Sequence, residues 1–209
     1  GAMLLLSKHP VELRYHLNNL LWKDAPRAQM PEAGFLSALA IAELKVVSQG
    51  LWVVEVVPAK HGPITLVAFQ NQTPVFDGPE DFNGLRNRAQ LRLLNDVMEG
   101  AFGDFPLKRF VLLGNSNLDP KRGDGDRAAI GALLADKRLS DAKPLSTLGG
   151  DTTAQWENPG AMRVSYVLPS ADWKIKSSGV FWPDAGPLHK AAEQASRHRL
   201  VWIDIRPPP

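Results

Sequence analysis

The stretch VLLGNSNLDP, residues 111–120, decides how this chain folds and where its site lies. Its apolar run ends at Gly114 and is followed by small polar residues and a proline. This pattern is typical of a buried strand that delivers side chains to a site at its carboxyl end. The side chains delivered here are Asn115, Ser116 and Asn117, and none of them carries a charge. The stretch therefore indicates either an active-site strand or the remnant of one.

The composition bounds what the chain can do. Its 209 residues, 44% of them hydrophobic, suffice for one substantial core. The 24 Lys+Arg and 22 Asp+Glu leave a formal charge of +2, too small to favour nucleic acid or an anionic membrane by bulk electrostatics. The absence of cysteine excludes disulfides, thiolate metal sites and cysteine nucleophiles. No apolar run approaches the roughly 18–20 residues that span a bilayer.

The two ends of the chain are interpreted as lying outside the folded domain. Residues 1–3, Gly-Ala-Met, are interpreted as the remnant of a purification tag, so we expect the natural start to lie elsewhere. Residues 4–206 are expected to form a single domain, and the prolines at 207–209 a tail.

Hydrophobic patterning alternates along the chain between strand and helix periods. The Val- and Thr-rich runs at 51–57 and 64–70, separated by AKHGP, predict a hairpin. Such mixing of helices with hairpins favours an α+β fold with antiparallel pairs over a doubly wound parallel sheet. The further predicted strands are 108–114, 162–170, 173–183 and 198–205, and the predicted helices are 86–102, 126–138 and 186–196.

Six motifs in order connect the chain to a known family. They are LWKDAPRA (21–28), AFQNQTPVFDGPEDFNGLRNRAQLR (68–92), GNSNLDP (114–120), RVSYVLPS (163–170), SGVFWP (178–183) and SRHRLVWIDI (196–205). With them the chain resembles the endonuclease/exonuclease/phosphatase superfamily, the metal-dependent phosphodiesterases related to deoxyribonuclease I, and most closely its secreted bacterial branch. The resemblance implies a β-sandwich flanked by helices and favours a periplasmic or extracellular location.

The resemblance covers only the C-terminal portion of the family pattern. Family members begin with a strand that carries a catalytic Asn, followed by a helix and a strand that ends in a metal-binding Glu. Nothing before Leu4 supplies either residue, so the N-terminal unit is expected to be missing. A sandwich without that unit exposes a strand edge and apolar surface, which predicts self-association or capping by the segment 12–45.

The resemblance also implies where the catalytic residues would stand. In the family, carboxylates hold a divalent cation, a His stabilises the scissile phosphate and an Asp activates water. Here the mid-chain His position is filled by Gln70, and three Asp positions by Asn115, Ser165 and Arg197, whereas an Asn and a His are retained as Asn117 and His198. Arg is protonated at any relevant pH and is neither a general base nor a magnesium ligand. The ancestral Mg²⁺ site is therefore predicted to be lost, with no metal or other cofactor in its place.

These substitutions lead to three hypotheses about function. The first is a catalytically inactive, protein-binding scaffold. The second is a phosphate- or nucleic-acid-binding module without hydrolysis, in which Arg197, His198 and Arg199 contact the anion, although nucleic-acid binding is expected to be weak. The third is a residual phosphodiesterase completed by a separate N-terminal part. In the loop 75–87, the carboxylates are expected to form turns, and that loop would be the place for a cation if one bound.

Overall fold

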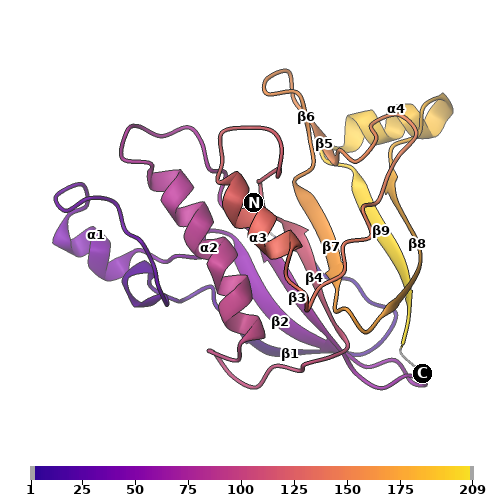
Figure 1. Ribbon diagram of the computed structural model, residues 1–209, viewed down its shortest axis with the longest axis horizontal. Helices are drawn as coiled ribbons and strands as arrows, with labels where there is room; N and C mark the ends of the chain where they lie inside the picture. Colours follow the sequence, from indigo (N-terminus) through magenta and orange to yellow (C-terminus); the bar gives the residue numbers. More distant parts are fainter. Residues whose placement is uncertain (1–2, 208–209) are drawn as a thin grey trace.

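The computed structural model describes residues 3–207 and shows a mixed sheet covered by helices (Figure 1). Residues 1–2 of the predicted tag remnant and residues 208–209 of the predicted tail lie outside the described residues. The strands are β1 (Val11–His16), β2 (Gly50–Val56), β3 (Ile64–Gln70), β4 (Phe110–Asn115), β5 (Ala154–Gln155), β6 (Ala161–Met162), β7 (Ser165–Pro169), β8 (Lys174–Phe181) and β9 (Leu200–Arg206). The helices are η1 (Trp22–Asp24), α1 (Ala38–Glu43), α2 (Phe82–Met98), α3 (Arg127–Leu134) and α4 (Gly186–Ala195).

Five strands form the main sheet, in the order β1-β2-β3-β4-β7. Each neighbouring pair is antiparallel except β3 and β4, which run parallel. A parallel pair needs a crossover, and α2 provides it between the two strands. The predicted hairpin is confirmed as β2 and β3, which pair over their full length from Gly50–Gln70 to Val56–Ile64.

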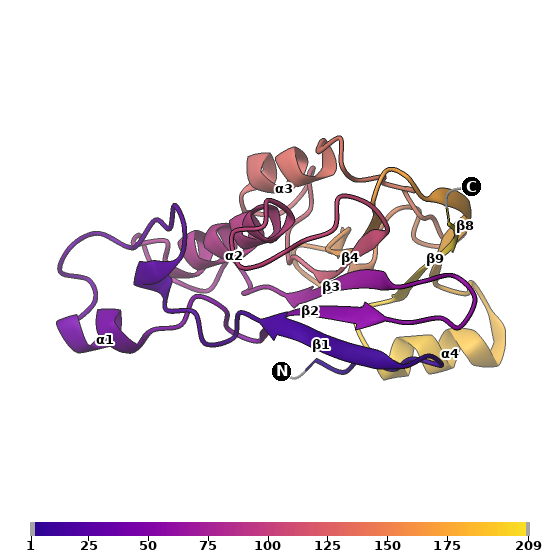
Figure 2. The same cartoon turned by 90° about the horizontal axis from the view of Figure 1, so that it is seen from below.

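A second, smaller layer contains the antiparallel pair β8–β9. Helices α2 and α3 lie on one side of the five-stranded sheet and α4 on the other (Figure 2). Along β9, Val201 and Ile203 are half-buried, whereas Leu200 and Trp202 point outward with 66% and 40% of their surface exposed. The predicted α+β architecture is confirmed, with a two-stranded second layer among residues 3–207.

The core lies between α2 and the main sheet. Strand residues such as Phe69 and Leu112 pack with helix residues such as Leu94 and Val97, and all are at most 2% exposed. The near-continuous apolar run of β4 reflects its central position, because both of its edges are paired. Within residues 3–207, none of the helices combines the length and apolar character that crossing a membrane requires.

Helix α2 departs from the sequence prediction on one face. The amphipathic pattern predicts that its Asn, Gln and Asp side chains face solvent, but Asn87, Gln90 and Asp96 are at most 2% exposed. The second side of the helix is covered by the segment before β2. There the Gln90 side chain donates to the carbonyl oxygen of Val46 (2.7 Å) and to Ser48 Oγ (3.1 Å). Tertiary packing therefore overrides the local polarity pattern.

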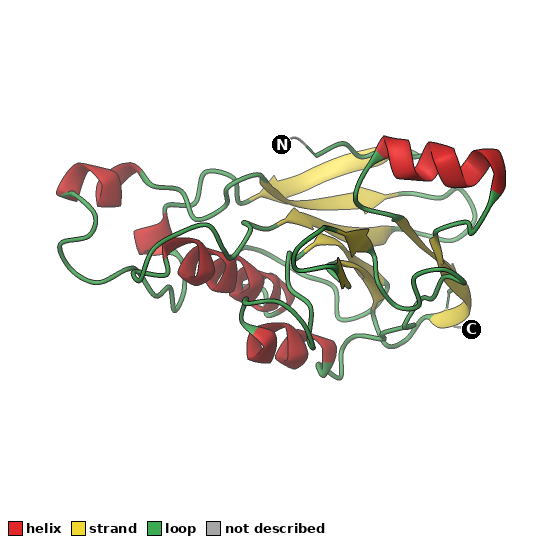
Figure 3. Ribbon diagram, turned by 90° about the horizontal axis from the view of Figure 1, so that it is seen from above, coloured by secondary structure: helices red, strands yellow, loops and turns green. Residues whose placement is uncertain are grey.

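The open edge of the main sheet is formed by β1. This strand belongs to the segment that was expected to cap the sheet, and it pairs with β2 from Val11–Val56 to His16–Trp52. Its outer edge lacks a partner strand among the described residues. At one end of the molecule, α1 extends away from the sheet and buries none of its residues (Figure 3).

The side chain of Asn87 connects two segments of the chain, and we predict that this connection stabilises the fold. Its side-chain nitrogen donates to the carbonyl oxygens of Gln72 (2.5 Å) and Ser116 (2.8 Å). Asn87→Ala leaves both acceptors without this donor, so we expect the free energy of unfolding to fall by about 2 kcal/mol or more. Urea denaturation measures it, and the exposed Arg92→Ala on the same helix should change stability by less than about 0.5 kcal/mol. An equal fall in the free energy of unfolding in the two variants would show that the hydrogen bonds of Asn87 do not stabilise the fold.

Candidate functional site

Three of the positions that the family resemblance assigns to catalysis form a row across the main sheet. At the carboxyl end of the parallel pair, Gln70 lies opposite Asn115. On the other side of β4, Asn115 lies opposite Ser165, the first residue of β7. The sequence analysis assigned these residues to one site, and the strand register brings them together.

The amide groups of this row are bound to one another and to nearby backbone. Asn115 Nδ2 donates to Asn117 Oδ1 (2.9 Å), and the backbone N–H of Asn117 donates to Asn115 Oδ1 (2.9 Å). Asn117 has a left-handed backbone with φ of 56°, a conformation that Asn tolerates better than most residues. This conformation closes a reciprocal turn, and the side chain of Asn117 then donates to the carbonyl oxygen of Asn71 (2.8 Å).

Asn71 is a member of the site that the sequence analysis missed. It is 2% exposed, its backbone N–H donates to the Asn115 carbonyl (2.9 Å), and its own carbonyl oxygen also accepts from Gln70 Nε2 (3.4 Å). Its side-chain nitrogen finds no acceptor among the described residues. The only sequence signal was its place directly after Gln70, because its partners come from a strand more than forty residues away.

The backbone of His198 is connected to the row through the segment that contains Thr153 and Ala154. The hydroxyl of Thr153 accepts from the backbone N–H of Ser165 (3.0 Å), and the next residue, Ala154, forms an isolated antiparallel bridge with His198. The His198 ring meets Trp156 edge-on, with centroids 5.5 Å apart. Burial lowers the pKa of His198 from its ordinary 6.5, and the positive charge of Arg199 lowers it further. Both effects favour the neutral form of the imidazole.

The two arginines beside His198 lie in different environments. Arg197 is exposed, whereas Arg199 is 5% exposed, with its guanidinium 4.4 Å from the centroid of the Trp182 ring. Arg199 also donates to Glu193 and to the carbonyl oxygen of Ser196. The guanidinium of Arg199 is thus bound within the fold, whereas that of Arg197 is exposed to solvent.

Asp119, the carboxylate nearest in sequence to the row, accepts hydrogen bonds from backbone N–H groups. Asp119 is 3% exposed and accepts from the N–H groups of Lys121 (2.7 Å), Arg122 (3.1 Å) and Arg163 (2.6 Å). Within residues 3–207 no group of three or more His, Asp or Glu side chains is placed so that it could hold a metal ion.

Two of the three carboxylates in the loop before α2 make turn contacts as the sequence predicts, whereas Asp81 lies 3.9 Å from Arg88. Asp77 Oδ2 accepts from the backbone N–H of Asn83 (2.5 Å), and Glu80 Oε1 accepts from that of Gly78 (3.1 Å). These are turn-forming contacts, and they fix the shape of the loop.

The family model for the endonuclease/exonuclease/phosphatase family matches residues 1–198. The chain belongs to the endonuclease/exonuclease/phosphatase family. Proteins of this family are normally metal-dependent nucleases or phosphatases. A comparison with curated proteins finds no match.

Solved structures of family proteins share the fold at low sequence identity. The chain is similar to an endonuclease/exonuclease/phosphatase from Beutenbergia cavernae, with 19% identity, a TM-score of 0.54, and coverage of 76% of this chain and 39% of that one. It is also similar to an endonuclease/exonuclease/phosphatase family protein from Bacteroides thetaiotaomicron, with 15% identity, a TM-score of 0.51, and coverage of 76% and 55%. This chain therefore spans about half or less of the length of these relatives.

The site residues do not fit the divalent cation of the family. The row offers two amides and a hydroxyl in Gln70, Asn115 and Ser165, and the neighbouring amide of Asn117 is bound within the turn. Mg²⁺ and Mn²⁺ favour sites with anionic oxygen ligands, and neutral oxygens alone bind them weakly. His198, which is half-buried, supplies a neutral nitrogen and no negative charge.

The lowered pKa of His198 predicts a pH dependence of stability. Below pH 6.5 the unfolded chain takes up a proton that the native imidazole resists, so this residue's contribution is present above that pH and is lost as the pH falls. We expect His198→Gln to lose less stability than the wild type between about pH 7.5 and about pH 5.5. Urea midpoints at both pH values measure the difference. An identical loss in both proteins would show that His198 does not titrate abnormally.

Proposed function

We propose that this chain is a non-catalytic member of the endonuclease/exonuclease/phosphatase family that acts as a protein-binding scaffold. The observation that supports it is the row Gln70–Asn115–Ser165, which lacks a carboxylate and whose amide groups are engaged in hydrogen bonds within the protein. A pocket with no anionic ligand and no charged acid or base lacks the groups that the family's hydrolysis requires.

The electrostatics of the site support the loss of catalysis. A cation in the row would meet no negative charge there, whereas a single carboxylate 4 Å away would attract it by about 4 kcal/mol per unit charge at an effective dielectric near 20. His198 has also lost the acid expected to orient it, because Arg197 stands at that position. The neutral imidazole packs against Trp156 instead.

Surface composition supports a binding role. Large apolar side chains lie exposed at several places, including Leu39 (75%) on α1 and Leu200 (66%) on β9. Single exposed apolar residues are ordinary, but contiguous ones usually mark an interaction surface. The short, apolar α1 buries none of its residues, and Leu200 lies next to Phe181 in the β8–β9 pair.

Anion binding has weaker support. Of the three residues expected to contact an anion, Arg199 is bound to Glu193, and His198 is held neutral. Arg197 remains exposed and charged. One exposed arginine gives little affinity for a phosphate in water.

A hydrolysis assay tests the proposed inactivity. With Mg²⁺ or Mn²⁺ present, the chain should release no product above the protein-free rate from DNA, RNA or bis-p-nitrophenyl phosphate. Metal-dependent turnover that disappears in His198→Ala would overturn the proposal, because it would place His198 in a working site.

Restoring two carboxylates tests the reason for inactivity. Asn115→Asp with Ser165→Asp puts two negative charges opposite one another across β4 and β7, where like charges destabilise the pairing. We expect the melting temperature of this double variant to be below that of the wild type in EDTA and to rise on adding Mn²⁺, by an amount equivalent to about 1–3 kcal/mol at saturating metal. The matched control, Asn115→Ala with Ser165→Ala, should not respond to Mn²⁺. An equal response of the wild type would show that its site already binds the metal.

A further inference from the structure

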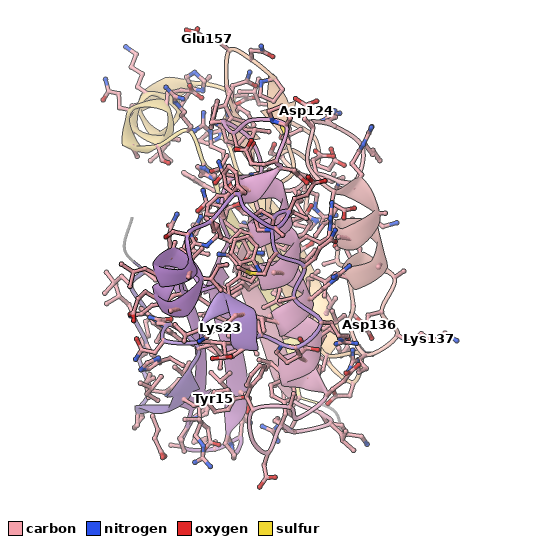
Figure 4. All side chains as sticks on the ribbon, turned by 90° about the vertical axis from the view of Figure 1, so that its left-hand side faces the viewer. Tyr15, Lys23, Asp124, Asp136, Lys137 and Glu157 are labelled. Carbon is pink, nitrogen blue, oxygen red and sulfur yellow. The ribbon has the colours of Figure 1, made fainter. Side chains whose placement is uncertain are left out.

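A groove runs between α2 and α3, and nothing among the described residues fills it. Its volume is about 610 Å³. Leu91 from α2 and Ala129, Ala132 and Leu133 from α3 supply its apolar lining. Asp124 and Asp136, just before and after α3, mark the two ends of that helix on this side of the molecule (Figure 4). The alanines of α3 are too small to fill the space between the two helices.

Arginines form the rim of this groove. Arg88 donates to Asp126 (2.5 Å), and Arg27 is paired with the buried Asp96. Arg92 is exposed, its guanidinium donates to the carbonyl oxygen of Arg27 (3.2 Å), and its positive charge acts on the buried Asp96. The groove therefore combines an apolar floor with a rim of mixed charge. Asp126 and Asp136 line it beside the arginines, and Arg92 is the one of the three arginines that forms no salt bridge among the described residues.

The loop between β3 and α2 carries an exposed aromatic ring followed by carboxylates. Phe76 at its tip is 91% exposed, and its φ of 72° is a left-handed conformation that a bulky side chain rarely adopts. Such a conformation persists only where the surrounding contacts impose it, and it often marks a functional position. Asp77, Glu80 and Asp81 follow the ring within five residues.

Hydrogen bonds within the loop hold Phe76 in this position. Asn83 Nδ2 donates to the carbonyl oxygen of Val75 (2.9 Å), and the backbone N–H of Asn83 donates to Asp77 (2.5 Å). Gln72 Nε2 donates to Asn83 Oδ1 (3.1 Å), which ties the start of the loop to the same residue. Because these bonds already order the loop backbone, docking of the loop costs little backbone entropy.

We propose that the Phe76 loop of one chain docks into the α2–α3 groove of a second copy, and that the second copy returns the same contact. The aromatic ring matches the apolar floor, and a carboxylate of the loop matches Arg92 at the rim. Loop and groove adjoin, because Arg88 approaches both Asp81 (3.9 Å) and Asp126 (2.5 Å). A two-fold axis beside this junction gives an isologous dimer with two identical contacts. The dimer rests on the proposed protein-binding role and names the partner.

The same charges argue against a nucleic acid at Phe76. Stacking of a base on the ring would bring the phosphate backbone toward Asp77, Glu80 and Asp81, and like charges repel. The exposure of Phe76 also shows that the loop does not occupy the groove of its own chain.

Sedimentation of the full chain over a range of concentrations tests the proposal. The wild type should shift from monomer to dimer as its concentration rises, since association follows mass action. Phe76→Ala and, separately, Arg92→Glu should each weaken the dimer at least about tenfold. Leu107→Ala, which removes a side chain that is 88% exposed and lies after α2, is the matched control and should leave the dimer unchanged.

A charge exchange tests the predicted complementarity. Glu80→Lys alone should weaken the dimer, and Glu80→Lys combined with Arg92→Glu in one chain should restore part of the association, because both contacts then carry exchanged charges. Circular dichroism checks that each variant folds.

Three results would overturn the dimer. They are a monomer at every concentration, a dimer that Phe76→Ala leaves unchanged, and tighter binding of single-stranded DNA by the wild type than by Phe76→Ala. Each of these leaves the hydrolysis assay untouched. Failure of the dimer is therefore distinguishable from failure of the proposed inactivity.

Discussion

The parallel pairing of β3 with β4 is the constraint from which the rest of the structure follows. It requires a crossover, and the 17 residues of α2 supply one that lies across the sheet and builds the core. It also sets the register that places Gln70 opposite Asn115. Because β7 then pairs with the far side of β4, Ser165 enters the same row. The loop from β3 to α2 must leave from this edge, so Phe76 belongs to the region beside the row.

Amides stand in this row where the family pattern has charged and titratable groups. An amide carries both a donor and an acceptor, so neighbouring amides satisfy one another, as Asn115 and Asn117 do. Carboxylates in the same places would accept only, would repel one another and would need a cation or a donor between them. At these positions the amides instead form hydrogen bonds with one another and with nearby backbone. Such hydrogen bonds stabilise the folded chain but supply no charged group for catalysis.

Buried polar side chains of α2 have a structural part in this arrangement. Asn87 joins the carbonyls on both sides of the row, from Gln72 and Ser116, while Gln90 accepts from the Gln72 N–H (2.5 Å) and donates to Val46. Most buried polar groups are hydrogen-bonded, and here the bonds of Asn87 and Gln90 reach loops that have no regular pairing of their own. The helix thus serves both as a layer of the core and as the support of the site and of the Phe76 loop.

The sequence by itself determined the class of fold, and the resemblance predicted that the catalytic groups of the family are replaced. Strand and helix periods predicted the β2–β3 hairpin, α2, β4 and α3, because these segments bury a regular apolar pattern. The motif resemblance assigned Gln70, Asn115, Asn117, Ser165, Arg197 and His198 to one region, and the strand register brings Gln70, Asn115 and Ser165 into a row.

Only the tertiary structure decided which polar groups are bonded and which remain available. Local periodicity could not show that Asn87 and Gln90 are buried, because a segment distant in sequence covers them. It could not separate Arg197 from Arg199, since the partners of Arg199 come from Trp182 and α4. Nor could it reveal Asn71 or the α2–α3 groove. Contacts between residues far apart in the chain depend on packing, and packing is a property of the folded molecule as a whole.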